Sequence, residues 1–149
     1  WDTWSMDHTL SYIILPMLKQ LQSTKHGAPN VDDEDVPMSL KSTMSKSEKE
    51  NEWDPDDNYF RRWDYVLDEM IFAFEHLVDD SWEEKFRSGV IDHKSVPCKW
   101  DENGKPTLYT FEEGPNHTYK CDYEGMKKVE ERMNNGFRLF GKYFRALWD

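Results

Sequence analysis

The stretch that most constrains the fold is 57–79, in which large apolar residues recur every three or four positions. This spacing matches the turn of an α-helix and predicts a helix with one broad apolar face, capped by Asp56 or Asp57. The residues of that face are Phe60, Trp63, Leu67, Met70, Ile71, Phe74 and Val78. Such a face is buried in a folded protein, so other elements of the chain should cover it.

Two further segments, at about 6–23 and 123–147, show the same helical spacing. Pro16 lies inside the first and should kink or break it, because proline lacks a backbone donor and clashes with the preceding turn. We expect the three helices to pack around one core of aromatic and aliphatic side chains. The residues expected in this core are Leu10, Ile14, Trp63, Leu67, Phe74, Phe137, Phe140 and Phe144.

Two glycines, Gly136 and Gly141, lie inside the last helical segment, where each costs about 1 kcal/mol relative to alanine. Asp122, just before this segment, is a suitable N-cap. The glycines are best explained if another element crosses the helix closely at their positions.

Between the second and last helices the pattern changes to that of strands. Short strands are predicted at Val96–Trp100, Thr107–Phe111 and His117–Cys121, separated by Asn-Gly and Gly-Pro turn signals. They predict a small antiparallel β-meander at about 96–121. The expected fold class is therefore α+β, mainly α, with three principal helices packed with this meander.

The chain has 149 residues, which suits a single domain, 1–149. Within it, residues 28–56 hold three prolines, an acidic run at 32–35 and a polar stretch at 39–52. This composition predicts a long polar loop that is partly mobile.

Charge excludes several functions. Thirty acidic against nineteen basic residues give a net charge of −11, which repels nucleic-acid phosphates and acidic membranes. We therefore expect no direct nucleic acid contact and no membrane association. There is no run of eighteen apolar residues and no signal peptide at the start, so a soluble, intracellular protein is predicted.

A row of carboxylates runs beside the apolar face of the second helix and forms the first candidate site. Such a row at the edge of a helix interface suits Mg²⁺ or Mn²⁺ and is typical of a metal-dependent hydrolase acting on a nucleotide or phosphate ester. The alternative, which is the commoner outcome, is a solvated flank in which Arg61 bridges neighbouring carboxylates and no cofactor is bound. The candidate metal-binding residues are Asp57, Asp64, Asp68 and Glu75.

Two histidines and two cysteines, His93, Cys98, His117 and Cys121, form a candidate zinc set. Their spacing disfavours zinc, because there is no tight Cys-x-x-Cys knuckle, and free thiols are expected instead. The chain also lacks a Gly-rich phosphate loop, a Gly-x-Ser-x-Gly elbow and a His-Glu-x-x-His helix. The sequence therefore assigns no catalytic residue.

Several runs of the chain resemble a family of small tailed-bacteriophage proteins that also occurs in marine viral sequence. The resemblance spans nearly the whole chain and carries over no activity or catalytic residue. Members of the family have a further N-terminal segment, whereas this chain opens at Trp1, so we expect it to be part of a longer protein. The runs that carry the resemblance are WDTWSMDHTL at 1–10, KHGAP at 25–29, DDEDVP at 32–37 and NGFRLFGKY at 135–143.

The expected function is that of a non-enzymatic phage accessory protein in the cytoplasm of the infected host cell. It would bind a protein partner, host or phage, through acidic helical surface or through the 28–56 loop. The metal-dependent hydrolase is one alternative. An acidic DNA mimic is another, since rows of carboxylates imitate DNA phosphates.

Overall fold

The structure is a computed structural model that describes residues 3–45, 51 and 53–148. It divides into two compact units, which are described separately below. The helical unit comprises Trp1–Asp80 and Lys127–Asp149, and the hairpin unit comprises Ser81–Met126. The expected α+β, mainly α fold is confirmed, with antiparallel strands as the minor component.

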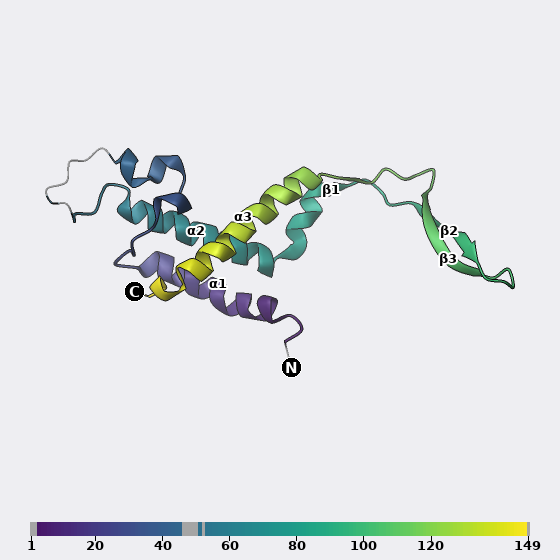
Figure 1. Cartoon of the computed structure of the whole chain (residues 1–149), viewed down its shortest axis with the longest axis horizontal. Helices are drawn as coiled ribbons and strands as arrows, with labels where there is room; N and C mark the ends of the chain where they lie inside the picture. Colours follow the sequence, from purple (N-terminus) through teal and green to yellow (C-terminus); the bar gives the residue numbers. More distant parts are fainter. Residues whose placement is uncertain (1–2, 46–50, 52, 149) are drawn as a thin grey trace. The chain divides into compact units, whose positions relative to one another are not determined.

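Three principal helices lie close to their predicted positions: α1 (Met6–Thr24), α2 (Tyr59–Val78) and α3 (Tyr123–Lys142) (Figure 1). The predicted break in the first helix is wrong, because α1 continues through Pro16. The last helix is shorter than predicted and is followed by a 3₁₀ turn at Phe144–Ala146. Asp122 caps α3 as predicted, since its carboxylate accepts a hydrogen bond from the Gly125 N–H at 2.9 Å.

The core of the helical unit follows one face of α2. Its centre consists of Trp63, Val66, Leu67 and Met70, none of them more than 1% exposed. Leu18 of α1, Leu139 of α3 and Tyr143 pack against this face. Of the predicted core, Trp63, Leu67 and Phe74 are buried, whereas Ile14, Phe137 and Phe140 are partly buried at its margin.

Two residues were wrongly placed in the core. Leu10 is 42% exposed and Phe144 is 61% exposed. Both fit the helical spacing, but spacing gives only the approximate direction of a buried face. In α1 the buried residues are Ser11 and Leu18, and His8 Nδ1 lies 3.0 Å from the Leu77 carbonyl oxygen of α2, so Leu10 lies beside the covered face. Phe144 lies in the 3₁₀ turn that follows α3, where the helical spacing no longer applies.

Residues 28–45, the described first part of the predicted polar loop, form a packed segment. Its backbone makes short 3₁₀ turns at Asp33–Asp35, Met38–Leu40 and Ser42–Met44. Three of its apolar side chains, Val31, Val36 and Leu40, belong to the core. The five-residue step from Val31 to Val36 fits neither the helical nor the strand period, so the pattern did not reveal this part of the core. Residues 46–50 and 52 of the predicted loop lie outside the described residues.

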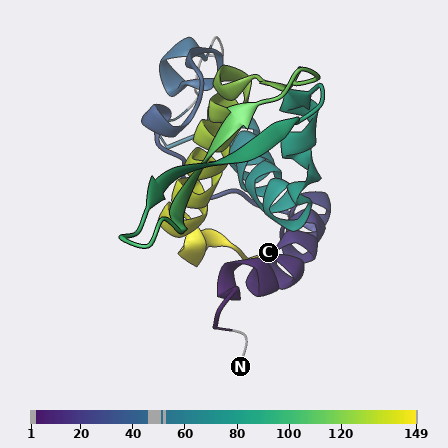
Figure 2. The ribbon, with the colours of Figure 1, turned by 90° about the vertical axis from the view of Figure 1, so that its right-hand side faces the viewer.

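The hairpin unit contains two small antiparallel sheets. Strands β2 (His93–Trp100) and β3 (Pro106–Glu113) form a long hairpin, seen in Figure 2 as a twisted ribbon. Strand β1 (Arg87–Ser88) pairs with β4 (Lys120–Cys121). Trp82 is the only residue of Ser81–Met126 that is buried, and every residue of this range is described.

The predicted β-meander is wrong in its third strand, because His117–Cys121 does not pair with β3. After β3 the chain turns back beside the segment that precedes β2: Gly114 N–H donates to Asp92 O at 2.8 Å, and Thr118 N–H donates to Val90 O at 3.0 Å. The two-residue strand β4 then reaches β1. The outer edge of β3 therefore has no paired strand among the residues that the structure describes.

Gly136 of α3 lies against the backbone of α2, as predicted. A Cβ added there would stand 2.3 Å from the Glu69 carbonyl oxygen and 2.6 Å from the Ala73 Cβ, distances that van der Waals radii forbid. The corresponding prediction for Gly141 is wrong, because a Cβ added at that position would meet no atom within 4 Å. Only one of the two glycines therefore serves helix packing.

Gly136→Ala should destabilise the fold by about 2 kcal/mol or more, because the methyl group forces α2 and α3 apart. Gly141→Ala should leave the fold as stable or make it more stable by up to about 1 kcal/mol, since alanine is the better helix former. Chemical denaturation of the two variants measures both effects. Equal loss of stability in the two variants would contradict the close crossing at Gly136.

Candidate functional site

Three members of the carboxylate row on α2 contact α1. Each of the three carboxylates has a separate polar partner from that helix or its C-terminal cap, and the partners succeed one another in antiparallel order. The contacts are the Lys19–Glu75 and Lys25–Asp64 ion pairs, each 2.6 Å, and a 2.6 Å hydrogen bond from Gln22 Nε2 to Asp68. The row is thus a line of contacts between two helices.

The other two residues of the predicted row, Asp57 and Arg61, form hydrogen bonds with partners outside α1. Asp57 precedes α2, and its backbone N–H donates to Ser45 Oγ at 3.4 Å. Arg61 donates a hydrogen bond to Asn58 Oδ1 at 3.1 Å. The structure therefore does not gather Asp57, Asp64, Asp68 and Glu75 around one point.

The candidate zinc set lies in the hairpin unit. Cys98 is exposed on β2 and Cys121 is half-buried on β4, and both are free thiols. The rings of His93 and His117 stack with their centroids 4.6 Å apart, and His117 Nδ1 accepts the Asp92 N–H at 3.2 Å. These four residues do not converge as ligands.

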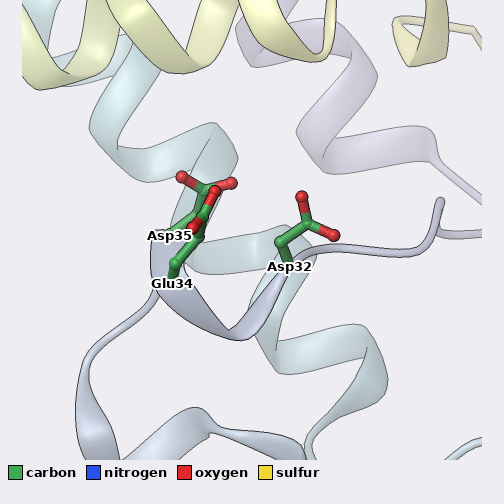
Figure 3. A group of neighbouring side chains, drawn as sticks. All are labelled: Asp32, Glu34 and Asp35. Atoms are coloured by element: carbon green, nitrogen blue, oxygen red, sulfur yellow. The ribbon is translucent and has the colours of Figure 1, made fainter.

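A different set of carboxylates does converge. Within the described residues, the only His, Cys, Asp or Glu ligand atoms that gather in a group of three within 4.8 Å belong to Asp32, Glu34 and Asp35. Figure 3 shows these three side chains turned to the same side, toward the ribbon of α3. Lys142 at the end of α3 contacts all three: its Nζ lies 2.8 Å from Asp32, 3.0 Å from Glu34 and 2.6 Å from Asp35. A lysine ammonium therefore lies where a bound cation would lie.

Asp35 is the buried member of this cluster. Besides Lys142, Arg138 lies 2.7 Å from its Oδ1, and the Tyr143 hydroxyl donates to its Oδ2 at 2.7 Å. Burial opposes ionisation of Asp35, but hydrogen bonds from Lys142, Tyr143 and Arg138 outweigh it and hold the pKa of the carboxyl below its ordinary value. Burial and the hydrogen bond to Asp35 raise the pKa of Tyr143 to about 12. Asp35 is therefore ionised near neutral pH and fixes the end of α3.

A second buried ion pair lies at the start of α2. Arg62 donates to both oxygens of Asp56, at 2.9 and 2.7 Å, and to the Leu40 carbonyl oxygen at 3.2 Å. The hydrogen bonds to Asp56 raise the pKa of Arg62 despite its burial. This pair joins α2 to the 28–45 segment. Its charged groups therefore stabilise the fold and are not available to a ligand.

A separate surface of the helical unit is apolar. A groove of about 790 Å³ lies between α1 and the turn that follows α3, and none of the residues lining it is charged. Trp148 and Met17, on opposite sides, are 74% and 66% exposed. The other apolar side chains of its walls include Ile14, Leu21, Phe140 and Phe144.

The exposed apolar surface continues along α1 beyond the groove. Met6, Leu10, Ile13 and Met17 recur at helical spacing and are each between 42% and 66% exposed. Of these four residues only Leu10 was predicted to lie in the core. The row is therefore a hydrophobic helix face that the described residues leave uncovered.

Comparisons of the chain with protein-family models, with curated proteins and with solved structures gave no match. Among the described helices, none combines the length and the hydropathy needed to cross a bilayer.

The role of Lys142 was not predicted from the sequence. One signal was present: Arg138 and Lys142 are four residues apart and so lie on one face of a helix, which indicates that this face meets acidic groups.

Millimolar Mg²⁺ or Mn²⁺ should change the melting temperature little, because the α2 carboxylates are already engaged one by one by α1. Asp64→Asn should alter the free energy of unfolding by no more than about 1 kcal/mol, since the Asp64 side chain is half-exposed. Thermal unfolding of both proteins with and without the ions checks this. A metal-dependent rise of several degrees that disappears in Asp64→Asn would favour the hydrolase alternative.

Asp35→Asn should lower the free energy of unfolding by about 2 to 3 kcal/mol, because it removes a buried charge on which three side chains converge. Glu34→Gln is the matched control, with an expected change within about 0.5 kcal/mol, since that carboxylate is exposed. Denaturant titration at neutral pH measures both. The cluster would be unimportant for stability if the two variants behaved alike.

The contribution of Asp35 should also depend on pH. Folding lowers the pKa of this carboxyl, so its ionised form stabilises the native state above the unfolded value of about 3.9. The stabilisation is lost as pH falls through the lower native value. The stability difference between the wild type and Asp35→Asn should therefore be constant near neutrality and shrink below about pH 4.

Proposed function

We propose that this protein is a non-enzymatic accessory protein of a tailed bacteriophage, and that it binds a host or phage protein in the cytoplasm of the infected cell. The observation that carries the binding function is the uncharged apolar groove between α1 and the turn after α3. The phage setting rests on the sequence resemblance described above.

The proposed occupant is an amphipathic helix of the partner. The exposed row on α1, at positions i, i+4, i+7 and i+11, has the spacing with which helices pack side by side. Two of its four members are methionines, whose flexible side chains adapt to a partner surface. A helix lying along this row would reach the groove at Met17, the residue that the row and the groove share.

Charge favours this apolar surface over the acidic surface first expected. Binding through the α2 carboxylates would compete with the contacts that Lys19, Gln22 and Lys25 already make with them. The 28–45 segment is likewise used by the fold, because Val31, Val36 and Leu40 lie in the core. In an acidic chain, an uncharged groove avoids repelling an acidic partner.

Site-specific photo-crosslinking in cells that contain the partner tests the proposal. A photoreactive residue at Met17, in the groove, should capture a segment whose apolar residues recur every three or four positions. The same probe at Met38, which is 65% exposed but outside the groove, is the control. Equal capture at both positions would contradict a specific groove.

The captured segment, made as a synthetic peptide, should bind the purified protein and gain helicity on binding. Met17→Asp should weaken its binding at least tenfold, because the change places a charge in an apolar contact, whereas Met38→Asp should not. A peptide that binds without becoming helical, or that ignores Met17→Asp, would refute the helix-in-groove proposal.

A further inference from the structure

The hairpin unit exposes apolar side chains that another strand or a helix would cover in a stable sheet. Trp100, Leu108, Tyr109 and Phe111 are between 49% and 72% exposed. An isolated two-stranded hairpin is marginally stable in water, and further strands or a packed helix are needed to stabilise it. The hairpin therefore has the features of a sheet that is completed by another chain.

The two edges of the hairpin differ in how well they can accept another strand. Strand β2 contains Pro97, two register irregularities between Pro97 and Trp100, and the charged residues Lys94 and Lys99. Proline, bulges and lysines are the features by which edge strands avoid pairing. Strand β3 begins with Pro106, a position at which proline is tolerated, and has none of these features within Thr107–Phe111, which consists of threonine, leucine, tyrosine and phenylalanine. Only the β3 edge is open to another strand.

The charges of β3 indicate which strand fits. A basic residue, Lys105, stands before the strand, and acidic residues, Glu112 and Glu113, stand at its end. An antiparallel copy of the same strand brings the basic end of one beside the acidic end of the other, whereas a parallel copy brings like charges together. Glu112 already faces Lys94 across the hairpin. Glu113 lies 3.9 Å from His117 Nε2, but its side chain is 76% exposed and can reach a second chain.

We propose that the protein forms a two-fold symmetric dimer through antiparallel pairing of β3 with β3 of a second copy, centred on Tyr109. In this register Glu113 stands opposite Lys105 of the second copy, and Thr107 stands opposite Phe111 of the second copy. Moving the centre to Thr110 would instead set Glu113 opposite Thr107, and moving it to Leu108 would leave Glu113 beyond Lys105. Tyr109 is therefore the centre that matches both charge and apolar side chains.

Charge exchange tests the register in the full chain. Sedimentation over a range of concentrations should show a monomer–dimer equilibrium. Lys105→Glu alone or Glu113→Lys alone should weaken the dimer roughly tenfold, because two cross-strand pairs change from attraction to repulsion. The double variant Lys105→Glu/Glu113→Lys should restore dimerisation, and Lys99→Glu on β2 should leave it unchanged.

Disulfide trapping tests the same register independently. In a Cys98→Ser/Cys121→Ser background, Tyr109→Cys should form a disulfide-linked dimer on mild oxidation, because directly opposed residues lie about 5 Å apart. Thr107→Cys, on the same face of the same strand, should not, since its copies would lie well beyond disulfide reach. Circular dichroism confirms that each variant is folded.

Three results would overturn the proposal. The first is a wild type that sediments as a monomer at every concentration, which would leave the β3 edge to a different protein or to solvent. The second is a double charge exchange that fails to restore the dimer lost in the single variants. The third is a Thr107→Cys variant that cross-links as readily as Tyr109→Cys.

Discussion

The buried carboxylate of Asp35 is the constraint on which the arrangement of the helical unit depends. A charge removed from water is tolerated only where cations and hydrogen-bond donors surround it. Here those groups are Arg138, Lys142 and Tyr143, all from the last turns of α3 and the residue after it. The 28–45 segment and the end of α3 therefore stabilise each other.

Polar and apolar contacts contribute differently to the stability and the position of the 28–45 segment. Val31, Val36 and Leu40 supply the buried area, which is largely indifferent to exact register. Asp35 at one end and the Arg62–Asp56 pair, which also binds the Leu40 carbonyl, supply directional contacts. The apolar side chains thus stabilise the segment, and the buried ion pairs specify where it lies.

Sequence periodicity predicted the helices well because each of them has a repeated apolar face. It identified Trp63 and Leu67 correctly and placed Leu10 and Phe144 wrongly, since Leu10 lies beside the buried line of Ser11 and Leu18 and Phe144 follows the end of α3. The third strand was mispredicted for a similar reason. Its pairing depends on where the chain after Gly114 turns, and that turn is set by hydrogen bonds to Asp92 and Val90, which no local pattern reveals.

The candidate site shows the same limit. The carboxylate row of α2 was visible in the sequence, but its partners Lys19 and Lys25 lie on another helix, and only the fold shows that they face it. The acidic run at 32–35 was equally visible, yet it was read as part of a solvated loop. Its cation, Lys142, is more than a hundred residues away, so the cluster exists only in the folded chain.

A segment without helix or strand periodicity can therefore carry the mutational sensitivity of a core helix. Residues from Val31 to Leu40 should vary little among homologues, because most of them are either packed against α2 or bound to α3. Gly27, just before the segment, is different, since a Cβ added there would meet no atom within 4 Å. Length and sequence variation in this part of the chain should accumulate at that junction, outside the Asp35 cluster.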